Sequence, residues 1–235
     1  MSEVVGNGML AKAFMARSSD VTLPDGCVFF CSGVSNSSEV KKSEFQRERE
    51  LAIKEINKAD ASTFVYFSSV ASVTESSEYY KHKLEMENVV GDLSKSYLIF
   101  RLPQVVGCVN NNTLFPSFIR KIKKGEPLEI YSKSTRCLID VDDVVRLSSF
   151  ILKKGYENTT IDLCPCDSIT PLELARLISK EVGVKSKVEI VDKGGSYPYG
   201  SHEDKTIIGE DDSIFSKNYY SLVVKKYAKK IFAIT

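Results

Sequence analysis

Short apolar segments and amphipathic helical segments alternate along the first part of this chain. Cys27 to Cys31 is a continuous apolar run, as expected of a strand covered on both faces, and Ala61 to Phe67 is expected to form the next buried strand. A charged helical pattern from about Val40 to Asn57 lies between them, and another spans Glu78 to about Val90. This alternation predicts an α/β fold with a doubly wound parallel sheet.

The remaining pattern predicts a core and a smaller lobe. Further strands are expected at Glu3–Val5, Tyr97–Phe100, Leu128–Ile130, Thr160–Cys164 and Lys187–Val191, and further helices at Met9–Arg17, Thr113–Lys124, Val141–Leu152, Thr170–Val182 and Phe215–Ala233. Val21–Leu23 is interpreted as a remnant strand and Asp192–Asp212 as a loop. We therefore expect a core over residues 1–106 and a C-terminal α/β lobe over 107–235, with about 140–165 returning to the core.

Charge and cysteine usage narrow the functional classes. The net charge of +1 gives no field that would recruit nucleic acid or an anionic membrane. No apolar stretch approaches the roughly 20 residues that a membrane helix needs, and the N-terminus lacks a signal-peptide pattern. The cysteine spacings match no zinc pattern, so no metal site is expected. We expect a cytoplasmic protein with free thiols.

Two local patterns carry chemistry. Gly6-Asn7-Gly8 follows the first predicted strand and precedes a helix, the order that presents backbone N–H groups to a pyrophosphate. Tyr79 and Lys83 are four residues apart, so on a helix they share one face. A nearby ammonium lowers the pKa of a phenol and suits it to proton transfer. Taken alone, the first pattern is a tight turn and the second an exposed pair.

The joint order of several motifs resembles a known family. The motifs are Gly6–Ala11 (G-x-G-x-x-A), Ser68-Ser69, Tyr79-x-x-x-Lys83, Arg101–Gly107, Gly125–Tyr131 and Arg136–Val144. Together they resemble the extended short-chain dehydrogenase/reductase family, in particular its NAD-dependent nucleotide-sugar epimerases, dehydratases and 4-ketoreductases. The resemblance extends over nearly the whole chain and implies a Rossmann-like core.

That resemblance assigns expected roles to individual residues. The implied catalytic residues are Tyr79 as acid/base, Lys83 as the group that lowers its pKa, and Ser69 as a hydrogen-bonding partner of the substrate oxygen. Implied cofactor contacts are Gly6, Gly8, Met9, Leu10, Ala11, Ser32, Gly33, Lys83, Pro103 and Val105. Implied contacts to a sugar-nucleotide substrate are Gln104 and Arg136, the latter at its diphosphate. His82 is interpreted as a surface or packing residue.

The chain departs from the family pattern on the adenine side. Only about fifteen residues separate the glycine loop from the strand at Cys27, where relatives place further strand–helix units. No acid for the adenosine ribose can be placed, since Asp20 and Asp25 lie in turn-like sequence. The first Rossmann half is therefore expected to be shortened. We expect NADP or NAD as cofactor, with a slight preference for NADP and Arg17 as a candidate contact.

The leading functional hypothesis is an NAD(P)-dependent 4-ketoreductase of a sugar nucleotide in polysaccharide biosynthesis. A nucleotide-sugar 4-epimerase uses the same residues but must retain its cofactor, which a shortened adenine side disfavours. A degenerate, non-catalytic nucleotide-binding member of the family is the rival from another class. The helices near 40–57 and 78–90 are candidates for pairing two subunits in a homodimer.

Overall fold

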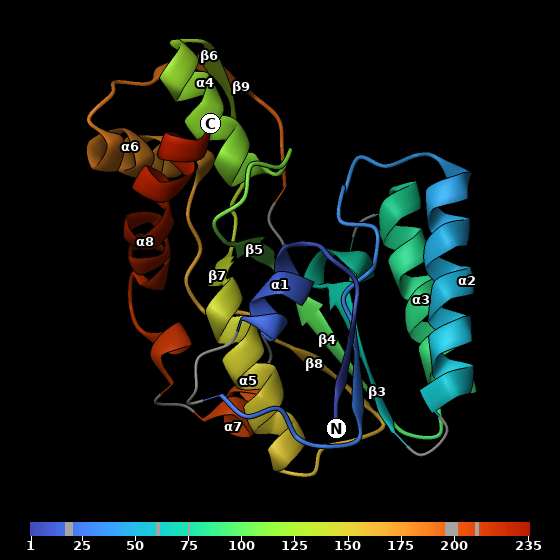
Figure 1. Ribbon diagram of the computed structural model, residues 1–235. Helices are drawn as coiled ribbons and strands as arrows, with labels where there is room; N and C mark the ends of the chain where they lie inside the picture. Colours follow the sequence, from blue (N-terminus) through green and yellow to red (C-terminus); the bar gives the residue numbers. More distant parts are fainter. Residues whose placement is uncertain (17–20, 60–61, 75, 196–201, 210–211) are drawn as a thin grey trace. The chain divides into compact units, whose positions relative to one another are not determined.

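The computed structural model describes residues 1–16, 21–59, 62–74, 76–195, 202–209 and 212–235 (Figure 1). The chain forms two compact units. Unit 1 comprises Met1–Leu102, Val141–Leu163 and Ser201–Ile208, and unit 2 comprises Pro103–Asp140, Cys164–Gly200 and Gly209–Thr235. Of the helices described, none combines the length and apolar character that crossing a membrane requires.

Unit 1 contains a five-stranded parallel sheet in the order β1-β2-β3-β4-β8. Its strands are β1 (Glu3–Val5), β2 (Cys27–Phe30), β3 (Thr63–Ser69), β4 (Tyr97–Leu102) and β8 (Thr159–Asp162). Its helices are α1 (Met9–Met15), α2 (Lys42–Ala59), η1 (Val70–Val73), α3 (Glu78–Leu93), α5 (Val141–Lys153) and α7 (His202–Ile208). The prediction of a Rossmann-like parallel sheet flanked by helices is confirmed.

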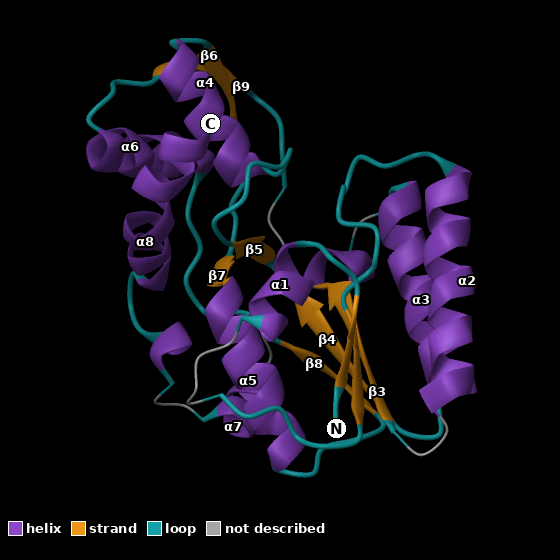
Figure 2. Ribbon diagram, viewed as in Figure 1, coloured by secondary structure: helices purple, strands orange, loops and turns teal. Residues whose placement is uncertain are grey.

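Helices cover both faces of this sheet, which explains the apolar runs in β2 and in the middle of β3 and β4. On one face, α2 and α3 lie side by side, and Phe30, Phe64 and Tyr66 pack there in one buried cluster (Figure 2). On the other face, Phe14 of α1 lies 4.6 Å from Phe29, ring centroid to ring centroid. Alternate residues of β2 therefore fill two separate cores, as the pleat of a strand requires.

Strand β1 lies at an edge of the described sheet, with β2 as its neighbour. Residues 16–26 connect α1 to β2, and the described part of this connection, residue 16 and residues 21–26, contains no strand. In a full Rossmann fold, two further strands continue the sheet beyond this position and carry the adenosine. Unit 1 thus has the shortened first half that the sequence predicted.

Unit 2 combines two small parallel sheets with helices. The sheets pair β5 (Gln104–Val106) with β7 (Leu138–Asp140), and β6 (Pro127–Tyr131) with β9 (Lys187–Val191). The helices are α4 (Leu114–Lys124), α6 (Pro171–Val182), η2 (Ser213–Phe215) and α8 (Tyr219–Ile234). Helix α6 begins as predicted: Pro171 occupies its first turn, and the Thr170 hydroxyl caps it by accepting a bond from the Glu173 N–H at 3.2 Å.

Two sequence interpretations of local structure are wrong. Val21–Leu23 forms no strand, because β1 pairs with β2 instead. The segment interpreted as a loop over 192–212 contains α7, whose last residue, Ile208, is buried, and the Lys154 ammonium binds the carbonyl of Ile207. Its polar composition concealed this short helix. Arg17, a candidate cofactor contact, lies outside the described residues.

The turn between β1 and α1 depends on one of its two glycines. Gly6 has φ +126°, and a Cβ there would lie 2.7 Å from the carbonyl oxygen of Cys31, whereas a Cβ at Gly8 would meet nothing within 4 Å. We expect Gly6→Ala to lower the free energy of unfolding by about 1–3 kcal/mol through strain and collision. Gly8→Ala, the matched control, meets no collision and should cost less, about 0.5–1 kcal/mol through the weaker N-cap. Urea unfolding measures both, and equal effects would contradict the turn geometry.

Candidate active site

The predicted catalytic and cofactor residues of unit 1 gather at the carboxyl ends of its parallel strands. Gly6 follows β1, the Ser32–Val34 segment follows β2, and Ser69 ends β3. Because neighbouring parallel strands end at one edge of a sheet, these segments lie at the same edge, where nucleotides bind in folds of this kind.

The glycine loop has the packing that the motif requires. Gly8 immediately precedes α1 and adopts an extended conformation, and Met9 and Leu10 form the first turn of that helix. Ala11 is fully buried, which explains why only a small side chain fits there. The loop therefore retains a turn that can hold the pyrophosphate half of a dinucleotide.

Ser69 lies at the junction between β3 and η1. Its hydroxyl caps η1 by accepting a bond from the Ala71 N–H at 3.3 Å. A hydroxyl that accepts such a bond still has its own hydrogen to donate. The preceding Ser68 is different: it is buried, and its hydroxyl donates to the Glu87 carboxylate at 2.5 Å. Of the two serines, Ser69 is the one suited to a substrate oxygen.

Tyr79 occupies the first turn of α3 and is 8% exposed. Its ring meets that of Tyr80 edge to face, with centroids 5.0 Å apart. Burial raises the pKa of Tyr79 above its ordinary value, the Lys83 ammonium lowers it, and the Glu48 carboxylate raises it again. The predicted lowering effect of Lys83 is present, but burial outweighs it, so the pKa of Tyr79 is raised overall.

The Lys83 ammonium is bound to groups other than Tyr79. Its Nζ donates to Glu48 Oε1 at 3.0 Å and to the Tyr66 hydroxyl at 3.1 Å, and it lies 5.8 Å from the centroid of the Tyr79 ring. The residue is only 3% exposed. An ammonium has three N–H donors, so these two bonds leave one for a further acceptor.

Sequence reasoning missed Glu48 and Tyr66. Tyr66 points from β3 into the core, where burial and the adjacent carboxylate raise its pKa well above the ordinary value, so it remains a donor. Burial opposes ionisation of Glu48, yet the Lys83 ammonium and several hydrogen bonds outweigh it and hold its pKa far below the ordinary value. A signal existed: Glu48 shares the helical spacing of the apolar Phe45 and Ala52, which predicts an inward position.

The other predicted contacts belong to unit 2. Gln104 and Val105 lie in β5, which directly follows Pro103, and β5 pairs with β7. The side-chain Nε2 of Gln104 is buried and has no hydrogen-bond partner among the described residues. Arg136 donates to the carbonyl of Thr135 at 2.8 Å. Their roles toward a ligand stay predictions.

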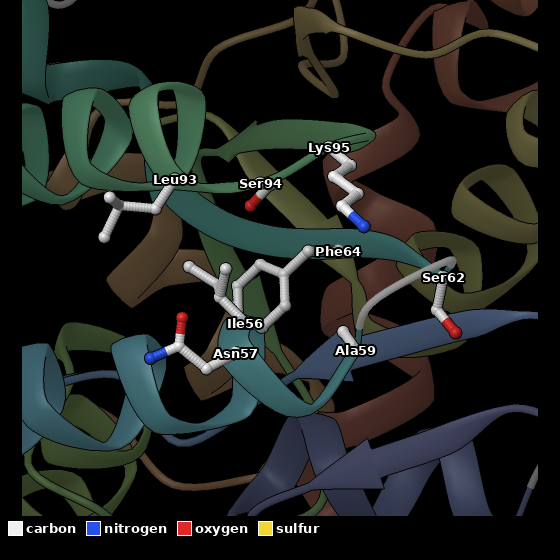
Figure 3. A pocket seen from close by; sticks show the side chains of 8 residues that line it. All are labelled: Ile56, Asn57, Ala59, Ser62, Phe64, Leu93, Ser94 and Lys95. Atoms are coloured by element: carbon white, nitrogen blue, oxygen red, sulfur yellow. The ribbon is translucent and has the colours of Figure 1, made fainter.

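A cavity of about 170 Å³ lies elsewhere in unit 1 (Figure 3). It is lined by the C-terminal ends of α2 and α3 and by Phe64, the second residue of β3. Ser69, a predicted catalytic residue, lies at the opposite end of that strand. The Ser94 hydroxyl beside it is buried without a partner among the described residues. The cavity therefore contains none of the predicted catalytic residues.

Glu48 should contribute pH-dependent stability. Glu48→Gln leaves Lys83 without its counter-charge, so we expect it to lower the free energy of unfolding by about 3–5 kcal/mol at neutral pH. The folded-state pKa is below the unfolded one, so this contribution is complete above the ordinary glutamate pKa and is lost as the pH falls below it. Urea unfolding from about pH 7 to about pH 3.5 measures this. A difference from the wild type that stays constant with pH would contradict it.

The chain is similar to a known protein family and to several solved structures. Residues 51–164 match the model of the NAD dependent epimerase/dehydratase family. A search of curated proteins found no match. Among solved structures, RMD from Pseudomonas aeruginosa complexed with NADPH is 16% identical with a TM-score of 0.79, covering 100% of this chain and 99% of that one. UDP-N-acetylglucosamine 4-epimerase from Bacillus cereus is 20% identical with a TM-score of 0.75, covering 100% and 95%. Residues 51–164 thus have the sequence pattern of the NAD dependent epimerase/dehydratase family, and the chain has the fold of the two enzymes named above.

Proposed function

We propose that this chain is an NAD(P)-dependent oxidoreductase that reduces the 4-keto group of a sugar nucleotide, in the cytoplasm and in polysaccharide biosynthesis. The match of residues 51–164 to the NAD dependent epimerase/dehydratase family supports a nicotinamide cofactor. Similar structures were solved with NADPH, or with UDP-glucuronic acid and NAD. These neighbours support a sugar nucleotide as the substrate class.

The position of Tyr79, buried in the first turn of α3 and one helical turn before Lys83, carries the proposal. A buried phenol with a raised pKa holds its proton at neutral pH, so it acts as a proton donor. Reduction of a ketone places negative charge on the substrate oxygen, and Tyr79 delivers a proton to that oxygen. The Ser69 hydroxyl donates a hydrogen bond to the same oxygen and stabilises the charge that develops there.

The residues of unit 1 fit the nicotinamide half of a dinucleotide. When bound, the reduced cofactor supplies the hydride that reduces the keto carbon. The remaining N–H of Lys83 is available to a ribose hydroxyl, and the turn at Gly6 is available to the pyrophosphate. Ser32, Gly33, Pro103 and Val105 remain proposed contacts. The slight preference for NADP over NAD is likewise a proposal.

Unit 2 offers donors for the sugar nucleotide. The buried Nε2 of Gln104 lacks a partner among the described residues, and an unsatisfied buried donor is costly unless a ligand supplies the acceptor. Arg136 is proposed to bind the diphosphate, which suits a planar guanidinium. This supports a substrate rich in oxygen acceptors.

A 4-epimerase is the second candidate, favoured by the similarity to the Bacillus cereus enzyme. Epimerisation begins with removal of a proton from a sugar hydroxyl, so it needs a phenolate at neutral pH. The raised pKa of Tyr79 opposes this first step. The third reading, a non-catalytic nucleotide-binding member of the family, is opposed by the presence of Ser69, Tyr79 and Lys83 in their expected elements.

Tyr79→Phe should abolish reduction. We expect kcat with a 4-keto sugar nucleotide and NADPH to fall by about 10²–10⁴-fold, because the proton donor is lost. Tyr80→Phe removes the adjacent hydroxyl of the same helix and should retain wild-type turnover. Oxidation of NADPH followed at 340 nm measures both. Unchanged turnover in Tyr79→Phe would exclude its catalytic role, and failure of any nicotinamide to bind the wild type would favour the non-catalytic reading.

The shortened first half should make adenosine dispensable. In the described sheet no strand continues beyond β1, so few contacts to the adenosine are expected. We expect reduced nicotinamide mononucleotide to bind within about tenfold of NADPH, a difference of about 1.4 kcal/mol. Nicotinamide fluorescence titration measures both constants. A loss of a hundredfold or more on removing the adenosine half would contradict this expectation.

A further inference from the structure

Glu48 lies in α2 at a point where four segments of unit 1 meet. Its side chain is completely buried. Oε1 accepts the Tyr66 hydroxyl at 2.6 Å and the Lys83 ammonium at 3.0 Å. Oε2 accepts the Val34 N–H at 2.6 Å and lies 3.1 Å from the Nε2 of His82. One carboxylate thus bonds the segment after β2, the strand β3 and the helix α3.

The Glu48 carboxylate packs against the backbone of the segment that follows β2. A Cβ on Gly33 would come within 2.8 Å of the Lys83 Nζ and 2.9 Å of Glu48 Oε1. The ion pair of Glu48 and Lys83 therefore packs against the backbone of Gly33. The hydrogen bond from the Val34 N–H to Glu48 fixes the next residue. The Glu48 carboxylate therefore contacts both the Ser32–Val34 segment and the Lys83 ammonium.

The carboxylate also balances the charge beside Tyr79. The Lys83 ammonium lies between two phenols, 5.1 Å from the ring centroid of Tyr66 and 5.8 Å from that of Tyr79. By itself it would stabilise either phenolate, but Glu48 opposes this at both rings. The other ionisable groups around this cluster are His82 on α3, which stacks on Phe45, Tyr80 against the Tyr79 ring, and Glu87, whose charge acts on Tyr66.

We propose that Glu48 is a positioning residue that holds Lys83 beneath the Ser32–Val34 segment and, by neutralising its ammonium, keeps Tyr79 a proton donor. The catalytic meaning of this inference rests on the proposed reduction, but the electrostatic coupling exists in the protein without ligands. Glu48 thereby keeps the proton on Tyr79 to a higher pH than the Lys83 ammonium alone would allow.

Titration of Tyr79 in the unliganded protein tests the coupling. Tyrosine labelled with ¹³C at Cζ reports ionisation of each phenol, and Tyr79→Phe and Tyr66→Phe assign the two signals. In Glu48→Gln, the Tyr79 signal should begin to move about one pH unit lower than in the wild type, because the ammonium is no longer neutralised. Glu55→Gln is the matched control: it removes another buried carboxylate from α2, one bound to Lys58, and should leave the Tyr79 titration unchanged.

Turnover gives a second readout that a merely structural role would not move. In Glu48→Gln, the alkaline limb of kcat/KM for reduction should shift to lower pH by the same amount, with kcat affected more than KM for the sugar nucleotide. An unchanged Tyr79 titration, or movement of Tyr66 in its place, would overturn the inference. A shifted titration without 4-keto turnover would instead refute the proposed function alone.

Glu48→Asp serves if Glu48→Gln does not fold. The shorter side chain keeps its charge but withdraws by one methylene from Lys83. The Tyr79 signal should then move at a pH between those of the wild type and a protein without the carboxylate. A titration identical to the wild type in a folded Glu48→Asp protein would count against the inference.

Discussion

The arrangement of the segments at the carboxyl ends of β2 and β3 in unit 1 depends on the interactions of one buried carboxylate, that of Glu48. Burying an unpaired charge costs several kcal/mol, so its cationic and hydrogen-bonding partners must be assembled as the unit folds. These partners are Val34, Tyr66, His82 and Lys83, which come from three separate parts of the chain. One side chain on α2 therefore fixes the relative placement of β3, α3 and the segment after β2.

Most of the fold could be predicted because its signals are local and strong. Strand β2 is apolar along its whole length, and helices such as α6 carry their own start signals in Thr170 and Pro171. Short elements were harder. Strands β5 and β7 have three residues each, too few to show a period, and exist because they pair with each other. Helix α7 ends in Ile207 and Ile208 but is otherwise polar, so its sequence resembles a loop.

For the candidate site, the sequence could predict only contacts between residues of the same helix. Tyr79 and Lys83 are four positions apart, which places both on one face of α3, and both are buried in the structure. Spacing cannot show that Tyr66, seventeen positions earlier on β3, offers Lys83 a nearer phenol, or that Glu48 on α2 offers it a carboxylate. These contacts join distant segments, and the Glu48 carboxylate adds to burial in raising the pKa of Tyr79, which Lys83 alone would lower.

The close approach at Gly33 has an evolutionary consequence. Any side chain at this position would displace either the ammonium of Lys83 or the carboxylate of Glu48. Drift at position 33 is therefore not independent of drift at positions 48 and 83. In descendants of this chain, a residue larger than glycine at position 33 should occur together with a smaller partner at one of the other two positions, so that covariation among the three would record the history of the ion pair.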